Sequence, residues 1–104
     1  MNQYSQVLCL SVALTVLGIG AACAQNLENG RRLSERWCTE CHAIDSTRAK
    51  PPRASSFASI AAKPTVTAEM ITSFLHMPHS TMPNVPLRRK DAQDIAAFIM
   101  DMKK

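Results

Sequence analysis

Two cysteines and a histidine lie within five consecutive residues, Cys38-Thr39-Glu40-Cys41-His42, and this cluster constrains the fold more than any other feature. Two sulfur atoms three residues apart on a helix project from one face, so both can attach to the same edge of a flat group. The adjacent imidazole can then bind a metal ion beneath that group. The chain therefore has to fold around whatever these three side chains hold.

The first 24 residues are typical of an export signal. Residues 7–23 are almost all apolar or small, and Ala22-Cys23-Ala24 has the small-x-small pattern of a signal-peptidase site. We predict a signal peptide over residues 1–24 and a mature domain over residues 25–104, with no stable membrane insertion after cleavage. A retained transmembrane anchor is the alternative, although the apolar run is near the short limit for spanning a bilayer.

The mature domain would hold 104 − 24 = 80 residues, a size at which a hydrophobic core alone gives only marginal stability. Cys9 and Cys23 would leave with the signal. A bridge between the remaining two cysteines would close a loop too small to add much stability. A bound cofactor is therefore the better supplement to the core.

Apolar residues recur at helical spacing in three segments, approximately 27–41, 65–77 and 91–102, and no segment alternates as a strand would. A short helical turn is expected around Phe57, and Thr65 or Thr67 is the expected N-cap of the second long segment. The polar stretch at 43–52 and the three prolines between residues 78 and 86 predict loops. The sequence thus predicts one all-α domain without repeats.

The C-x-x-C-H pattern of Cys38, Cys41 and His42 is the signature for covalent attachment of haem c. The thiols would form thioethers with two vinyl groups of the porphyrin, and the imidazole would bind the iron. A zinc site would need a second pair of ligands, which only His76 and His79 could supply. A thiol-redox site would lie near a βαβ pattern, which this sequence lacks. We therefore predict one covalently bound haem c per chain.

The proline-bounded loop offers a sixth ligand for the iron. Met77, His79 and Met82 lie in it, and His76 comes just before it. We predict Met82, because it lies deep enough for an extended segment to cross the far face of the porphyrin, where Pro83 would stiffen the chain. Met77 is better explained as a helix end, and the two histidines as solvated surface.

These residues make the chain similar to the class I cytochrome c family, particularly its short bacterial members, over Asn26 to Lys103. The stretch Met82-Pro83-Asn84 and the segment 94–99 match patterns of that family. The resemblance implies N- and C-terminal helices that cross, with shorter helices and loops wrapped around one haem. It also supports Met82 as the iron ligand, since the position of Met77 does not fit the family spacing.

Further residue roles follow from the resemblance. A glycine eight residues before the first motif cysteine, Gly30, and an aromatic residue sixteen after the methionine, Phe98, occupy the positions where the family packs its helix crossing. The family also uses a proline carbonyl to accept the N–H of the iron-binding imidazole. Pro51 and Pro52 are the candidates for this role, and we favour Pro52.

The predicted function is single-electron transfer without catalysis, because His42 and Met82 would fill both axial positions of the iron. One alternative is a gas sensor or peroxidase-like protein with an open sixth site. The other is a dedicated cytochrome subunit of an oxidoreductase complex. An export signal combined with haem c predicts a bacterial periplasmic location.

All charged side chains lie beyond residue 24, so the mature domain keeps a net charge of 12 − 8 = +4. This charge favours a redox partner with an acidic docking face. We expect the protein to be a monomer that forms transient complexes with such a partner. One tryptophan and no long basic run argue against nucleic acid. The last helix follows Leu87-Arg88-Arg89-Lys90 where relatives have a Ser or Thr cap. These charges could belong to a docking patch, pair with haem propionates, or form a solvated helix end.

Overall fold

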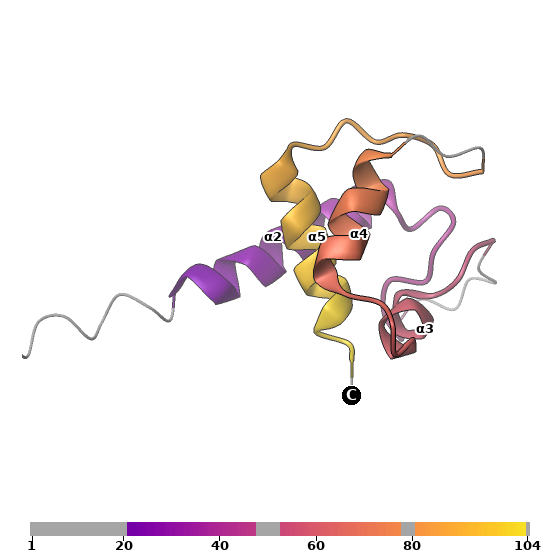
Figure 1. Cartoon of the computed structure of the whole chain (residues 1–104), viewed down its shortest axis with the longest axis horizontal. Helices are drawn as coiled ribbons and strands as arrows, with labels where there is room; N and C mark the ends of the chain where they lie inside the picture. Colours follow the sequence, from indigo (N-terminus) through magenta and orange to yellow (C-terminus); the bar gives the residue numbers. More distant parts are fainter. Residues whose placement is uncertain (1–20, 48–52, 78–80, 104) are drawn as a thin grey trace, which may run out of the picture.

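The computed structural model describes residues 21–47, 53–77 and 81–103. This part of the chain forms four helices and no strand, which confirms the all-α prediction (Figure 1). The helices are α2 (Ala21–Trp37), α3 (Phe57–Ala62), α4 (Ala68–His76) and α5 (Arg89–Met100).

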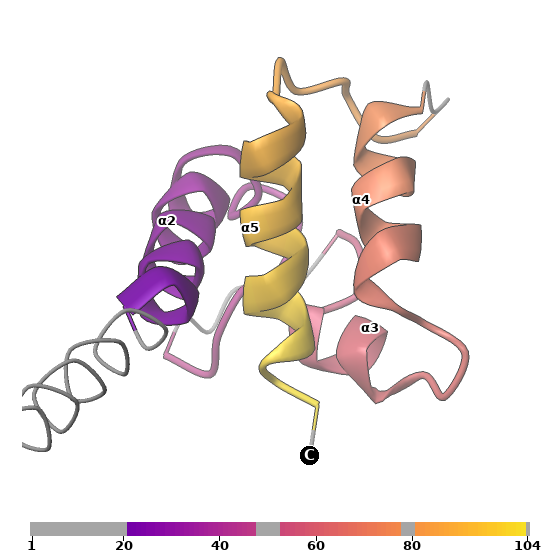
Figure 2. The same ribbon diagram turned by 60° about the vertical axis from the view of Figure 1, so that its left-hand side comes forward.

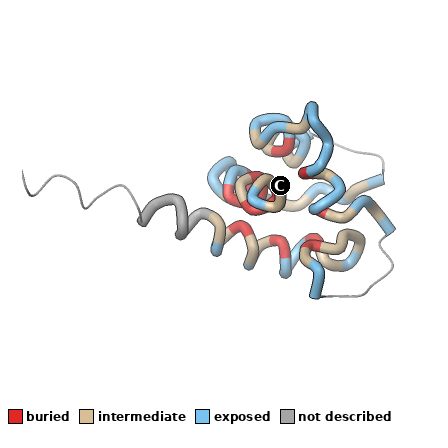
Figure 3. Tube along the Cα trace, turned by 90° about the horizontal axis from the view of Figure 1, so that it is seen from below, coloured by how far each residue is buried: buried red, intermediate tan, exposed pale blue. Residues whose placement is uncertain are grey.

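Helix α5 lies between α2 and α4 and packs against both (Figure 2). Helix α3 packs near the C-terminal end of α5. The buried residues of α5 are Ala92, Asp94, Ile95, Ala96, Phe98 and Ile99. Phe57 and Ala61 of α3, Ile71 of α4, and Cys38 and Ile44 from the segment after α2 complete the core. Buried positions lie on the helix sides that face the interior (Figure 3).

The crossing of α2 and α5 depends on Gly30. A Cβ atom added to Gly30 would overlap the backbone carbonyl of Asp94 and lie 2.9 Å from the Cβ of Phe98. The guanidinium of Arg31 lies over the Phe98 ring, 5.9 Å from its centroid. The close packing of Gly30 against Phe98 at a crossing of the terminal helices is thereby confirmed.

Side-chain caps fix where the shorter helices begin. Thr67 Oγ1 accepts the N–H of Met70 at 3.2 Å, so α4 starts after Thr67 rather than Thr65. Ser56 Oγ accepts the N–H of Ser59 at 3.1 Å and caps α3 in the same way. Each cap satisfies a backbone donor that the first turn leaves without a partner.

Helix α5 begins without such a cap. Its N-cap residue is Arg88, which makes no capping bond, and its Nε instead donates to Asp91 at 2.8 Å. Lys90 Nζ donates to Asp94 at 2.6 Å. The two carboxylates thus offset positive charges that the helix dipole disfavours at this end.

These carboxylates also connect α5 to α2. The amide of Asn29 donates to Asp94 at 2.7 Å and to Asp91 at 3.3 Å. Asp94 is only 3% exposed, and a buried carboxylate needs partners of this kind. A polar network therefore fastens the first turns of α5 to the middle of α2.

The predicted signal peptide falls mainly on residues 1–20, which lie outside the described residues, and the boundary at residue 24 remains a prediction. Helix α2 begins at Ala21. Across the residues that the structure describes, none of the helices combines the length and the apolar character required to span a bilayer.

Candidate functional site

The cysteines of the C-x-x-C-H motif lie in a turn that follows α2. The helix ends at Trp37, whereas the sequence pattern predicted that it would include both cysteines. The N–H of His42 still reaches the carbonyl of Cys38 at 2.9 Å, but the N–H of Cys41 bonds the same carbonyl at 3.3 Å. The Cys41 bond spans three residues instead of four, so residues 38–41 form a hydrogen-bonded turn and the regular helix stops before the motif.

The loop segment at 53–57 is held against this turn by its backbone. The N–H of Ala54 donates to the carbonyl of Cys41 at 3.0 Å, and the N–H of Phe57 donates to that of Ala43 at 2.9 Å. The Phe57 ring lies 5.5 Å from the imidazole of His42, centroid to centroid. The half-buried His42 ring therefore has a fixed piece of chain beside it.

Nδ1 of His42 lies 2.5 Å from the carbonyl oxygen of Ser55. A carbonyl can only accept, so Nδ1 carries the hydrogen and Nε2 keeps the lone pair with which a neutral imidazole binds a metal. Pro52, predicted for this accepting role, lies outside the described residues. No sequence signal pointed to Ser55, because any residue type has a carbonyl.

One cavity of about 270 Å³ brings three of the predicted site residues together, whereas Cys41 does not line it. Its wall includes Cys38 and His42 from the motif and Met82 from the loop before α5. Met77 is not part of that wall and is 51% exposed. The remaining lining residues are almost all apolar: Phe57, Ile60, Lys63, Val66, Met70, Ile71, Phe74, Leu75, Ile95 and Ile99.

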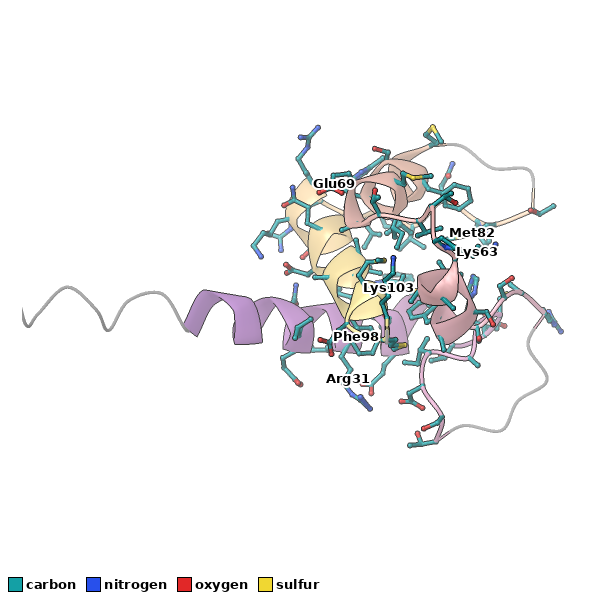
Figure 4. The ribbon with its side chains drawn as sticks, turned by 60° about the horizontal axis from the view of Figure 1, so that its bottom comes forward. Arg31, Lys63, Glu69, Met82, Phe98 and Lys103 are labelled. Carbon is teal, nitrogen blue, oxygen red and sulfur yellow. The ribbon has the colours of Figure 1, made fainter. Side chains whose placement is uncertain are left out.

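Most of these apolar lining residues could not be assigned to a cofactor cavity from the sequence. Met70 is one of them, although its position on the apolar stripe of α4 was a usable signal. Lys63 was not considered. Both Lys63 and Met82, labelled in Figure 4, line the cavity, and Lys63 contributes the charged ammonium group of the described wall.

The donor set suits a haem better than a zinc ion. Burial raises the pKa of the Cys38 thiol to about 11, and the neighbouring Ser34 hydroxyl offsets only part of this rise. The thiol is therefore protonated at physiological pH before anything binds to it, and a zinc ion would have to displace this proton. Within the described residues, no three His, Cys, Asp or Glu side chains gather into a metal site. Two thiols, one oriented imidazole, one thioether and an apolar wall match the attachment and ligation of haem c.

Comparison with known proteins gives the family. A family model described as "Cytochrome c" matches residues 27–103. The chain belongs to the cytochrome c family. A protein named cytochrome c-552, from Bradyrhizobium diazoefficiens, is 35% identical over 104 residues, which cover 99% of each chain. No solved structure matched the chain in the corresponding search.

Membership of this family confirms the resemblance inferred from the motif, and with it the cofactor. The cytochrome c carries haem c, covalently bound and one per chain. The broad function follows: this is a haem c electron carrier that works with redox partners.

Proposed function

We propose that this cytochrome c transfers single electrons through a haem held by Cys38 and Cys41, with His42 and Met82 as the two iron ligands. The observation that carries the proposal is that Cys38, His42 and Met82 line one largely apolar cavity, although 82 − 42 = 40 residues separate the two ligands. Haem c bound there would supply reversible one-electron chemistry at its iron.

His42 would act as a ligand of fixed orientation. Its Nδ1–H donates to the Ser55 carbonyl, and such a bond holds the ring and raises the basicity of the opposite nitrogen. Nε2 is then the metal-binding atom. The Pro52 carbonyl, predicted as the acceptor of the imidazole N–H, lies outside the described residues and stays a prediction.

Met82 is supported over Met77 by position. Met82 is half-buried in the cavity wall. Met77 is the C-cap residue that follows α4, and its N–H donates to the carbonyl of Phe74 at 3.2 Å. A thioether ligand in an apolar cavity favours ferrous iron and raises the reduction potential relative to two imidazoles.

With histidine and methionine both engaged, no coordination position remains for a substrate, so the protein would carry electrons without catalysing a reaction. The net charge of +4 would steer it towards an acidic partner face in brief complexes. Residues 1–24 would direct export to the periplasm, where the mature domain would function as a monomer.

The test is an absorption spectrum of the mature holoprotein, in ferric and ferrous forms, with and without carbon monoxide. We expect low-spin c-type bands, no reaction with carbon monoxide, and a far-red ferric thioether band. The band should disappear in Met82→Ala and persist in the matched control Met77→Ala. Carbon monoxide binding to the wild type would favour the sensor or peroxidase-like alternative, and co-purification with a stable larger partner would favour the subunit alternative.

Covalent attachment is tested separately. Cys38→Ala or Cys41→Ala should each leave one thioether bond, which shifts the ferrous pyridine haemochrome band to longer wavelength. The double variant should lose its haem in acidified acetone. Retention of the haem by the double variant would contradict attachment through these cysteines.

A further inference from the structure

The side chain of His76 contacts the backbone at the far end of the segment 76–87, which carries Met82. His76 is the last residue of α4. Its Nε2 lies 3.3 Å from the carbonyl oxygen of Leu87, eleven residues later, directly before the N-cap of α5. Its Nδ1 lies 3.1 Å from the carbonyl oxygen of Thr72, one turn back in α4. The ring therefore bridges the end of one helix and the start of the next.

This bridge lies on the side of α4 that does not line the cavity. Met70, Ile71, Phe74 and Leu75 line the cavity with Met82. His76 instead lines a separate groove between α4 and α5, together with Glu69, Thr72, Ser73, Arg89 and Gln93. Any effect of His76 on the iron ligand must therefore pass through the chain.

Leu87 is a firm attachment point for such a bridge. Its side chain packs against the core, and its N–H donates to the carbonyl of Val85 at 2.8 Å. Met82 lies six residues after His76 and five before Leu87, at the middle of the intervening segment. Fixing both ends of a segment removes conformations in which its middle lies elsewhere.

We infer that His76 is a positioning residue, whose Nε2–H bond to the Leu87 carbonyl keeps Met82 in the cavity. This inference rests on the proposed ligation by Met82. Both contacts are to carbonyl oxygens, which can only accept, and the bond to Leu87 is the one that spans the segment. One exposed hydrogen bond of this kind should change the equilibrium ratio of ligated to displaced Met82 about threefold.

Two amide substitutions distinguish the role of Nε2 from the role of Nδ1. Gln places its amide nitrogen near the position of Nε2, so His76→Gln keeps a donor for Leu87. Asn places its amide nitrogen near the position of Nδ1, so His76→Asn keeps the contact within α4 and loses the bridge. Ser73→Ala is the matched control, because Ser73 lines the same groove and is not part of the bridge.

The experiment titrates imidazole into the ferric holoprotein and follows loss of the far-red thioether band. Imidazole competes with Met82 for the iron, so its apparent Kd falls when Met82 is held less well. We expect a Kd about threefold lower in His76→Asn and His76→Ala, and a wild-type Kd in His76→Gln and Ser73→Ala.

Equal Kd values in the wild type and His76→Asn would overturn the inference, as would a Kd in His76→Gln as low as in His76→Asn. Both results presuppose a thioether band in the wild type, so they leave the proposed function intact. Absence of that band in the wild type would instead overturn the ligation by Met82, and the inference with it.

Discussion

Replacing Gly30 by alanine tests the helix crossing most sharply, because helix propensity and packing predict opposite signs. Alanine is favoured over glycine in a helix interior by about 1 kcal/mol. The added methyl group, however, would overlap the Asp94 carbonyl and approach the Phe98 Cβ to 2.9 Å. Neither atom can be moved by a change of rotamer, so α2 and α5 have to separate.

The size of the effect follows from that separation. Restoring ordinary carbon–carbon contact requires a shift of roughly 1 Å, which forfeits up to about half of the dispersion energy along the crossing. Overpacking of this kind costs about 3 kcal/mol at the upper end of the usual range. Subtracting the propensity gain of about 1 kcal/mol leaves a net loss of about 2 kcal/mol in the free energy of unfolding.

Thermal unfolding of the holoprotein, followed by far-UV circular dichroism, measures this loss. A loss of about 2 kcal/mol corresponds to a Tm lower by about 10 °C in a domain of this size. Glu28→Ala, an exposed substitution on the same helix, should leave Tm nearly unchanged. If Gly30→Ala were as stable as the wild type or more so, helix propensity would dominate and the packing argument would be wrong.

Three further predictions concern the helix starts. Thr67→Ala should lower the free energy of unfolding by about 1 kcal/mol, and Thr65→Ala by much less, because Thr67 is the residue that caps α4. Denaturant titrations measure both losses, and equal losses would contradict the assignment of the cap. Asp94→Asn should cost about 2 kcal/mol, since a buried carboxylate that accepts bonds from an amide and an ammonium group becomes a neutral amide. The pKa of Asp91 lies below its ordinary value, chiefly because its carboxylate accepts a hydrogen bond from Arg88. This pair therefore stabilises the fold at any pH above the pKa that Asp91 has in the unfolded chain. The contribution is lost as the pH falls through the lower pKa of the folded state. Arg88→Ala should therefore be less stable than the wild type at about pH 7 and as stable as the wild type at about pH 2. A carboxyl NMR titration of the variant should give a higher pKa for Asp91. A stability difference that does not depend on pH would refute the pairing.

The helices and their crossing could be predicted from the sequence because they follow local rules. Apolar periodicity located the helical segments, and the spacing of Gly30 and Phe98 from the motif located the crossing. Thr65 and Thr67 could not be separated, since either places an oxygen near the first turn. The end of α2 at Trp37 was missed because the change from helix to turn depends on backbone bonds and leaves the apolar pattern intact.

The contacts between distant segments were harder to predict. The carbonyl that meets His42 depends on the path of a loop, and loops carry no periodicity. The bonds from Asn29 to Asp91 and Asp94 join residues more than sixty positions apart. Nothing in one sequence distinguishes such polar side chains from solvated ones.

The position of Trp37 has a consequence for optical work on this protein. Trp37 is the chain's one tryptophan, is 43% exposed, and has the Arg36 guanidinium 4.9 Å from its ring centroid. It immediately precedes Cys38, so a haem joined to that sulfur stays within a few bonds of the indole even in the denatured chain. Energy transfer would then quench the indole emission before and after denaturation, which makes intrinsic fluorescence a poor probe of unfolding and a direct indicator of chains without haem.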